Sequence, residues 1–184
     1  RDRNYASNDR PEIMDKLLNQ EITSEIDHLI TGGTTTWSPL QNLTNKFTVG
    51  WDMAQIGNRN LRPFGFISAP AGIISDRQNI YQTLTFDYAG NSNRSITSDL
   101  RGTVSWGGQS VTTENRSTSA YGEGFPGPSN PTVDDAGITL GFEERTRVVN
   151  AGFFGQALFD FRDKYFMTVG ARVDGNSAFG QDFG

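Results

Sequence analysis

The sequence predicts an all-β fold, an antiparallel meander of about six long strands that forms part of a large transmembrane β-barrel. Three observations lead to this prediction. Apolar and polar residues alternate over long stretches, short and long connections alternate along the chain, and glycine and aromatic residues are abundant. The 184 residues include 21 Gly and 13 Phe, a composition that favours turns and sheets over helices.

The first part of the chain, residues 1–21, is expected to be a loop with one short helix. Asp9 can cap this helix, and Pro11 falls in its first turn. Because the helix is short, we expect it to dock on another part of the protein rather than stand alone. The docking face predicted from the helical spacing consists of Ile13, Met14, Leu17 and Leu18.

Over residues 22–184 the dominant period is two, which is typical of strands with two different faces. In the clearest stretch, Phe153, Phe159 and Phe161 share one face, while Asn150 and Asp160 share the other. We therefore predict a partial β-barrel over residues 22–184. Its expected strands cover about 22–36, 43–54, 81–90, 99–113, 145–161 and 165–179.

The connections between these strands alternate between short and long. The expected long connections are 55–80 and 114–144, and the short ones are 37–42, 91–98 and 162–164. In an antiparallel meander this alternation places every long connection at one rim, as in transmembrane barrels. Compact soluble domains rarely carry two loops longer than about 15 residues. A large soluble β-sandwich is the other fold that the strand pattern allows.

The composition excludes several functional classes. Sixteen Lys and Arg against 21 Asp and Glu give a net charge of −5, so nucleic acid is not an expected partner. There is no Cys and only one His, His28, and no apolar run is long enough for a membrane-spanning helix. No paired carboxylates, phosphate-binding loop or metal-ligand spacing is present. We therefore expect no enzymatic activity, no catalytic residues, no metal site and no cofactor.

The most specific motif lies in residues 152–180. It comprises Phe154-Gly155, Phe159-Asp160-Phe161, Asp163-Lys164-Tyr165, Arg172, Asp174-Gly175 and Ser177-x-Phe179-Gly180. With these residues the stretch resembles a hairpin that recurs in SusC/RagA-like TonB-dependent receptors of the bacterial outer membrane. Gln156 and Ala178 stand where the family often has Arg, and neither departure disturbs the pattern of strand, tight turn and strand.

The resemblance implies an internal segment of a barrel of about 22 strands, whose plug domain and TonB-contacting segment are expected to lie outside this sequence. It implies import of glycan- or peptide-like nutrients across the bacterial cell outer membrane. The implied partners are the rest of the barrel and its plug, the TonB complex, a SusD-like surface lipoprotein and the lipid bilayer. The alternative is a β-rich surface filament or adhesin subunit that assembles through its strand edges.

Three groups of candidate site residues follow from this interpretation. If the apolar faces meet lipid, the opposite faces line the lumen, and the candidates there are Asp52, Asp87, Asp160, Arg172 and Asp174. The alternative to a functional role is that they are hydrated wall residues or pair with one another, for example Arg172 with Asp160. Candidates for an aromatic girdle at the bilayer interface are Trp37, Trp51, Trp106, Tyr165 and Phe166, which otherwise pack across strands. Exposed outer-loop candidates for substrate or lid contacts, which otherwise pack within their own loops, are Phe64, Phe66, Tyr121 and Phe125.

Overall fold

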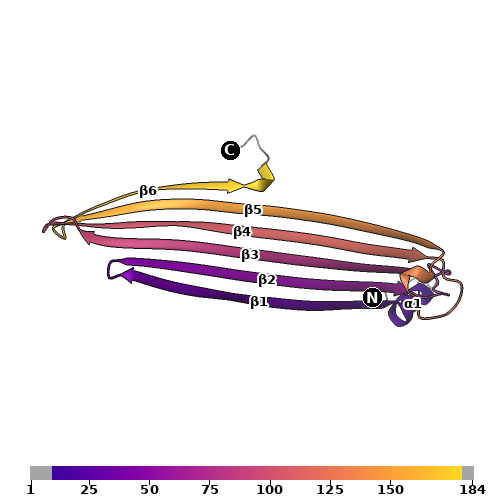
Figure 1. Ribbon diagram of the computed structural model, residues 1–184. Coiled ribbons are helices and arrows are strands. Elements are labelled where there is room, and N and C mark those ends of the chain that lie inside the picture. Colours follow the sequence, from indigo (N-terminus) through magenta and orange to yellow (C-terminus); the bar gives the residue numbers. More distant parts are fainter. Residues whose placement is uncertain (1–9, 180–184) are drawn as a thin grey trace, which may run out of the picture. The chain divides into compact units, whose positions relative to one another are not determined.

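The structure is a computed structural model that describes residues 10–179. Six strands form one sheet in the order β1-β2-β3-β4-β5-β6, so each strand pairs with its neighbours in the chain (Figure 1). The all-β antiparallel meander is confirmed and is consistent with a barrel fragment. The elements are α1 (Arg10–Asn19), β1 (Glu21–Leu40), β2 (Leu43–Arg62), β3 (Ile73–Ser95), β4 (Leu100–Glu123), η1 (Val133–Asp135), β5 (Ile138–Phe161), β6 (Tyr165–Asn176) and η2 (Ser177–Phe179).

Most strands are longer than the sequence pattern predicts. β1 to β5 have 20 to 24 residues each, whereas β6 has 12. The alternation of short and long connections is confirmed, but the predicted long connections 55–80 and 114–144 were wrong in extent, because only 63–72 and 124–137 lie between strands. The added ends of β2, β3 and β4 carry mostly polar side chains without an apolar period, whereas the added end of β5 has apolar residues at the alternate positions Ile138, Leu140 and Phe142. Backbone hydrogen bonds to neighbouring strands extend them regardless of that pattern.

Contacts divide the chain into two compact units, and each strand from β1 to β5 contributes to both. The long-connection unit contains the residues up to Asp27, together with Ala54–Ile80 and Asn115–Arg145. The short-turn unit contains His28–Met53, Tyr81–Glu114 and the residues from Thr146 onward. Among residues 10–179, no helix has the length and apolar character needed to cross a membrane.

The long-connection unit has a small hydrophobic core built by its connections. Leu61, Ile74 and Phe125 are 0–4% exposed, and two residues of the second connection, Val133 and Ala136, pack against them. The two connections also bond to each other, since the backbone N–H of Phe125 donates to the Ala71 carbonyl at 2.7 Å. These contacts hold both connections against the ends of their strands.

Gly72 permits this arrangement for two reasons. Its φ of +78° lies in the left-handed region that side chains disfavour. A Cβ atom at this position would also collide with the ring of Phe125. The glycine therefore lets the first connection turn directly beneath the aromatic ring of the second.

The short helix forms as predicted, but three of the four residues of its expected docking face do not dock, and the side chain of the fourth, Leu17, lies outside the described part of the chain. Ile13, Met14 and Leu18 are 47–71% exposed. The helix is attached instead through Asp15, which is buried and accepts a 2.6 Å hydrogen bond from the backbone N–H of Ile67. A carboxylate that satisfies a loop N–H thus replaces the expected apolar contact. The predicted cap, Asp9, lies outside the described residues.

Truncation of Phe125 tests the role of the small core. We expect Phe125→Ala to destabilise the second connection by about 3–5 kcal/mol, because it removes a buried aromatic side chain. The rate of limited proteolysis within residues 124–137 reports this change. Phe64→Ala is the matched control, since Phe64 is 43% exposed, and equal rates in the two variants would contradict the prediction.

The turn at the start of η1 supplies a pH test. Asp135 accepts hydrogen bonds from the backbone N–H and the hydroxyl of Thr132, at 2.6 and 2.8 Å, which hold the pKa of Asp135 below its ordinary value. Its contribution is therefore present above the unfolded pKa and lost as the pH falls through the folded pKa. We expect the Thr132 amide resonance to shift on acidification below the ordinary aspartate range. Asp135→Asn should abolish that shift, and a shift that persists in this variant would refute the assignment.

Candidate functional site

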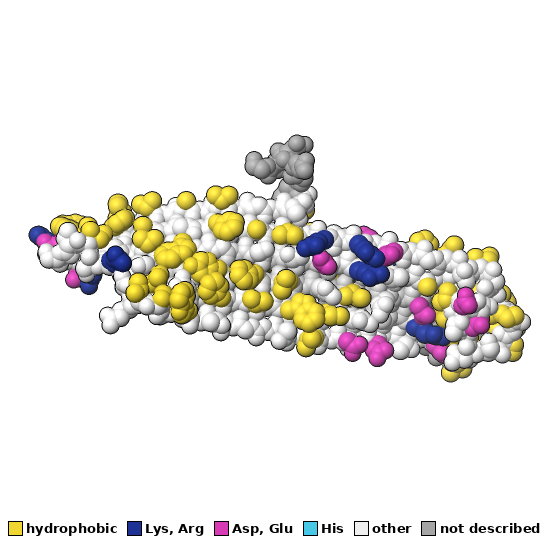
Figure 2. Space-filling view, in the orientation of Figure 1, with side chains coloured by type: hydrophobic (Ala, Val, Ile, Leu, Met, Phe, Trp, Pro, Cys, Tyr) yellow, Lys and Arg dark blue, Asp and Glu magenta, His cyan; other side chains and the backbone are white. Residues whose placement is uncertain are grey.

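One face of the sheet in the short-turn unit is apolar, and we call it the apolar face. Across β5 and β6, Phe153 lies opposite Val173, Ala157 opposite Val169 and Phe159 opposite Met167. Most of these side chains are exposed, with values of 71% for Phe153 and 73% for Val173. Figure 2 shows hydrophobic side chains gathered over this unit. The predicted two-faced strands are thus confirmed in the register of this pair.

The short-turn unit has no hydrophobic core beneath this face. Within the described part of the chain, the buried hydrophobic side chains all belong to the long-connection unit, and they are Leu61, Phe66, Ala69, Ile74 and Phe125. A sheet normally buries its apolar face against a second layer of structure. The apolar face of the short-turn unit therefore requires an external cover.

An aromatic cluster occupies the centre of the apolar face. The rings of Phe47 and Tyr88 stack with their centroids 4.8 Å apart. Trp106 Nε1 donates to the Tyr88 hydroxyl at 3.2 Å, and that hydroxyl donates to Asn45 Oδ1 at 2.9 Å. A cavity of about 610 Å³ with predominantly apolar walls adjoins these rings and Phe153. The polar atoms of the aromatic residues thus find partners within the face, as buried polar groups usually do.

Sequence reasoning missed Asn45, although a signal was present. Asn45 occupies an alternate position between Leu43 and Phe47, in the predicted apolar row. An isolated polar residue in such a row usually serves a specific hydrogen bond. In the structure Asn45 is 6% exposed and bonds the Tyr88 hydroxyl.

The five predicted lumen residues lie on the opposite face of the short-turn unit, which we call the polar face. Strand alternation places them there, and contacts across the strands support this placement. Asp174 lies opposite Gly152, and Asp160 binds Arg101. Whether this face lines a lumen stays a prediction. The residues concerned are Asp52, Asp87, Asp160, Arg172 and Asp174.

Four of these residues form separate local pairs rather than one site. Asp52 Oδ1 lies 2.7 Å from Nε2 of His28. Arg172 Nε donates to both carboxylate oxygens of Asp174, at 2.9 and 2.8 Å. The expected pairing of Arg172 with Asp160 was wrong, because in the register Arg172 faces Phe154 and Asp160 faces Phe166. The strand offset keeps the two side chains apart.

Asp160 belongs instead to a network that joins two neighbouring turns, which we call the turn clamp. Asp160 Oδ2 accepts from Nη2 and Nε of Arg101 at 2.6 and 3.1 Å, and its Oδ1 accepts from the backbone N–H of Asp163 at 3.0 Å. Arg101 also pairs with the Asp163 carboxylate. In the same clamp, Arg162 donates to Asp99 Oδ2 through Nη2 at 2.9 Å. The clamp thus connects the β3–β4 turn with the β5–β6 turn.

The clamp also supports an unusual backbone. Arg162 and Asp163 have φ values of +57° and +55°, in the left-handed region that non-glycine residues rarely adopt. Such a pair of residues forms the tight turn whose twist suits a hairpin. Hydrogen bonds from both the backbone and the side chain of Arg162 to Asp99 offset the strain. The sequence predicted the turn but gave no sign of its partner 63 residues away.

The girdle candidates divide between the two faces. Tyr165 lies opposite Phe161 and so shares the apolar face, whereas Phe166 lies opposite Asp160 and shares the polar face. Trp106 joins the aromatic cluster described above. Trp37 is 60% exposed. Trp51 lies four residues after Phe47 on β2 and therefore shares its face. The girdle role stays a prediction for all five.

The outer-loop candidates were wrong as a set of exposed loop residues. Phe66 and Phe125 are 2% and 4% exposed, because they pack within and between the connections. Tyr121 lies in β4 and donates to Glu123 at 2.6 Å. Phe64 alone of the four is an exposed loop residue, at 43%. Contact with a substrate or lid stays a prediction for Phe64.

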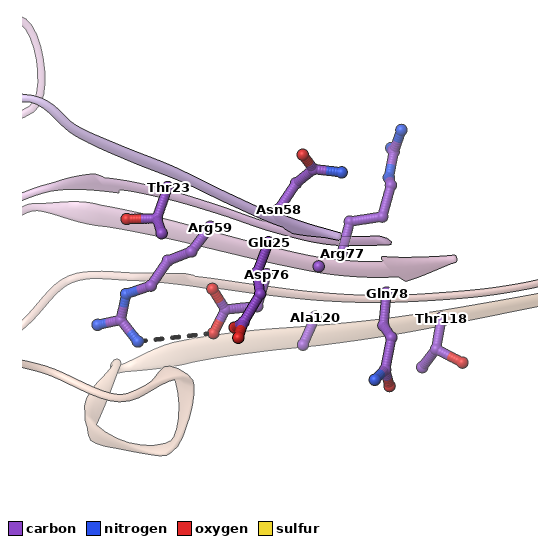
Figure 3. A pocket seen from close by; sticks show the side chains of 10 residues that line it. Thr23, Glu25, Asn58, Arg59, Asp76, Arg77, Gln78, Thr118 and Ala120 are labelled. Atoms are coloured by element: carbon purple, nitrogen blue, oxygen red, sulfur yellow. Dashed lines mark ion pairs between the residues drawn. The ribbon is translucent and has the colours of Figure 1, made fainter. Parts of the chain in front are cut away.

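A cavity of about 420 Å³ that is lined mainly by polar residues of β1 to β4 lies in the long-connection unit (Figure 3). Arg59 donates to the Pro131 carbonyl at 2.9 Å and lies 3.9 Å from an Asp76 oxygen. The other Asp76 oxygen is buried without a partner among the described residues. In Figure 3, Arg77 and Asn58 point to the opposite side. Among residues 10–179 no three His, Cys, Asp or Glu side chains gather as a metal site would need.

Removal of Arg101 tests the turn clamp. Because the Asp160 side chain is only 11% exposed, Arg101→Gln should cost about 1–3 kcal/mol of unfolding free energy through loss of a charged partner to a nearly buried carboxylate. Arg172→Gln should cost less, because both side chains of the Arg172–Asp174 ion pair are exposed. Denaturant unfolding of both variants measures the difference, and an equal or larger loss in Arg172→Gln would argue against the clamp.

Comparisons with known proteins show a shared fold. No protein-family model matches the sequence, and no curated protein matches it either. The solved structures described as the RagAB peptide transporter and as the RagAB peptide importer in the 'closed-closed' state both align with a TM-score of 0.79 and 19% identity. The importer in the 'open-open' state aligns with a TM-score of 0.77 and 20% identity. Each alignment covers 89% of this chain and 19% of the other. The chain therefore spans about one fifth of the length of those chains and has the fold of that segment. The low identity supports only a distant relation.

Proposed function

We propose that this chain forms part of the barrel wall of a TonB-dependent transporter in the bacterial outer membrane, which imports glycan- or peptide-like nutrients. The uncovered apolar face of the short-turn unit carries this proposal. In such a protein the bilayer supplies the missing cover, and the polar face lines the aqueous interior. The chain itself performs no catalysis in this proposal and binds no nucleic acid.

The length of the apolar row on β5 supports the bilayer as the cover. Alternate positions from Val149 to Phe161 hold only apolar residues or glycine over 13 residues of continuous strand. At about 3.3 Å per residue this row is about 40 Å long. At a tilt of about 40° it rises about 30 Å, which is close to the apolar band of transmembrane barrels.

The sheet edges support an assembly with further strands. β1 and β6 are the two edge strands, and every residue of β1 is exposed. Unpaired edges of this length invite pairing. In the proposed transporter, the remaining strands of the barrel cover both edges and close the wall around a plug.

Two separate resemblances support the choice of transporter class. The motif in residues 152–180 resembles that of SusC/RagA-like receptors, and the fold matches structures of a RagAB peptide transporter. From this class we infer the remaining partners, namely the TonB complex, which would energise import, and a SusD-like surface lipoprotein. A peptide is one of the two nutrient classes that we propose.

The second candidate is a surface filament or adhesin subunit, favoured by the same open edges of β1 and β6. The two functions differ in what covers the apolar face. A filament would cover it with other copies of the chain, and a transporter with lipid. Cell fractionation separates them, since the transporter should be extracted from outer membranes by detergent, whereas a filament should remain as detergent-resistant polymer.

A charge scan tests lipid exposure directly. In the full-length protein, Val169→Arg should destabilise the folded barrel by about 2–4 kcal/mol, because it places a guanidinium in the hydrocarbon. Thr168→Arg, at the adjacent position on the polar face, is the matched control and should have little effect. Denaturant unfolding in lipid vesicles measures both variants. Equal effects would refute the assignment of the apolar face to lipid.

Transport itself needs a separate assay. Uptake of labelled oligopeptides and oligosaccharides is compared in cells with and without the intact protein, and in cells that lack TonB. We expect uptake of one class to require both proteins. Uptake that is independent of both, for every oligomer tested, would overturn the transport proposal while leaving the membrane location intact.

A further inference from the structure

The cavity beside Arg59 and Asp76, which we call the Arg59 cavity, lies entirely within the long-connection unit. Arg59 precedes the core residue Leu61 by two positions on β2. Asp76 follows the core residue Ile74 by two positions on β3. Alternate residues of a strand share one face, so both charged residues lie on the face that carries the small core. The second connection reaches the same place, since Arg59 donates to its Pro131 carbonyl at 2.9 Å.

The two charged groups of this cavity are incompletely paired. Asp76 Oδ1 is buried and has no hydrogen-bond partner among the described residues, and a buried acceptor without a partner is costly. The other oxygen, Oδ2, lies 3.9 Å from Nη1 of Arg59, which is too far for a hydrogen bond. A guanidinium carries several N–H donors, and the Pro131 carbonyl accepts from Nη2. The cavity therefore presents an open acceptor and open donors within reach of one ligand.

Further lining residues add polar groups of different kinds. Glu25 on β1 supplies a carboxylate, Gln78 on β3 an amide and Thr118 on β4 a hydroxyl. Figure 3 shows these three side chains on the same side of the strands as Arg59 and Asp76. Hydrogen-bond donors and acceptors from four neighbouring strands thus surround one space.

This mixture of groups discriminates between classes of ligand. An anion would meet the carboxylates of Glu25 and Asp76, and a cation would meet the guanidinium of Arg59, so that either ion has a repulsive neighbour. A neutral ligand with neighbouring hydroxyl groups avoids both conflicts, because a hydroxyl donates as well as accepts hydrogen bonds. Such a ligand satisfies the carboxylate with one hydroxyl and the guanidinium with the next.

We propose that the Arg59 cavity binds a sugar ring through a pair of neighbouring hydroxyl groups. One hydroxyl donates to Asp76 Oδ1, and the next accepts from the Arg59 guanidinium. The volume of about 420 Å³ lies within the range of ligand-binding cavities. Ala120 gives part of the wall a carbon surface for the C–H groups of the ring. This site belongs to the long-connection unit and does not depend on the proposed transport function.

The test uses the full-length protein in micelles of lauryldimethylamine oxide, a detergent without sugar groups, in a buffer free of polyols. Binding of methyl glucoside, methyl mannoside and methyl galactoside is measured by saturation-transfer NMR. We expect at least one of them to bind, with a dissociation constant roughly in the millimolar range. Cyclohexanol, which has a single hydroxyl, should bind roughly tenfold more weakly. Failure of all three sugars to bind, or equal binding of cyclohexanol, would overturn the inference.

Gly57→Val shows whether the sugar occupies this cavity. Gly57 lines the cavity, and a Cβ atom added to it would meet no atom within 4 Å. Because valine suits a strand and its side chain fills space that the sugar needs, sugar binding should weaken roughly tenfold or more. The matched control is Gly141→Val on β5 of the same unit, where an added Cβ is equally unobstructed. Equal affinities in these two variants would place sugar binding elsewhere and overturn the inference.

Asp76→Asn tests the hydrogen bond to the carboxylate. The substitution keeps the shape of the side chain but removes a charged acceptor, so we expect sugar affinity to fall roughly tenfold. Arg77→Gln is the control, because Arg77 points to the opposite side in Figure 3, and it should leave the affinity unchanged. Unchanged affinity in Asp76→Asn would contradict the proposal. So would tighter binding of 1,4-diaminobutane than of every sugar, if Asp76→Asn weakened it, since this result would indicate a cation site.

Discussion

The rest of this structure depends on one constraint: the apolar face of the short-turn unit must be covered, and no second layer of the described chain covers it. The backbone hydrogen bonds between neighbouring strands are satisfied within the sheet, whereas the outer edges of β1 and β6 lack a partner strand there. The side chains on one face of the short-turn unit are different, because residues such as Phe153 and Val173 remain largely exposed. In water this exposure opposes folding. In a bilayer the same surface stabilises the inserted state.

The two units meet this requirement in different ways. The long-connection unit behaves like a small globular domain, since its connections bring Phe125 onto Leu61 and Ile74. The short-turn unit relies instead on specific polar links, namely the turn clamp and the hydrogen bonds from Trp106 to Tyr88 and on to Asn45. Such links fix side chains in a surface that has little packing around it. Each unit therefore has its own source of order.

Much of the fold could be predicted from local pattern, while most of the site contacts could not. Alternation identified Phe159 and Met167 as residues of one face, and they lie opposite each other. The same method failed at Arg59 and Asp76, where polar strand ends have no period to detect. It also failed for Phe66 and Phe125, because burial by a distant connection leaves no local trace. Arg101 and Asp160 are 59 residues apart, and only the register of the folded sheet brings them together.

The meander topology has a consequence for how the chain assembles. Each strand pairs only with its neighbours in sequence, so the sheet can grow by successive hairpins, each closing a short loop at low entropic cost. The bond from the Phe125 N–H to the Ala71 carbonyl departs from this pattern, because it joins two connections that belong to different hairpins. It cannot form until β3 and β4 are both in place. This contact therefore forms late in folding, after the hairpins that it joins, and it imposes an order on the assembly of the sheet.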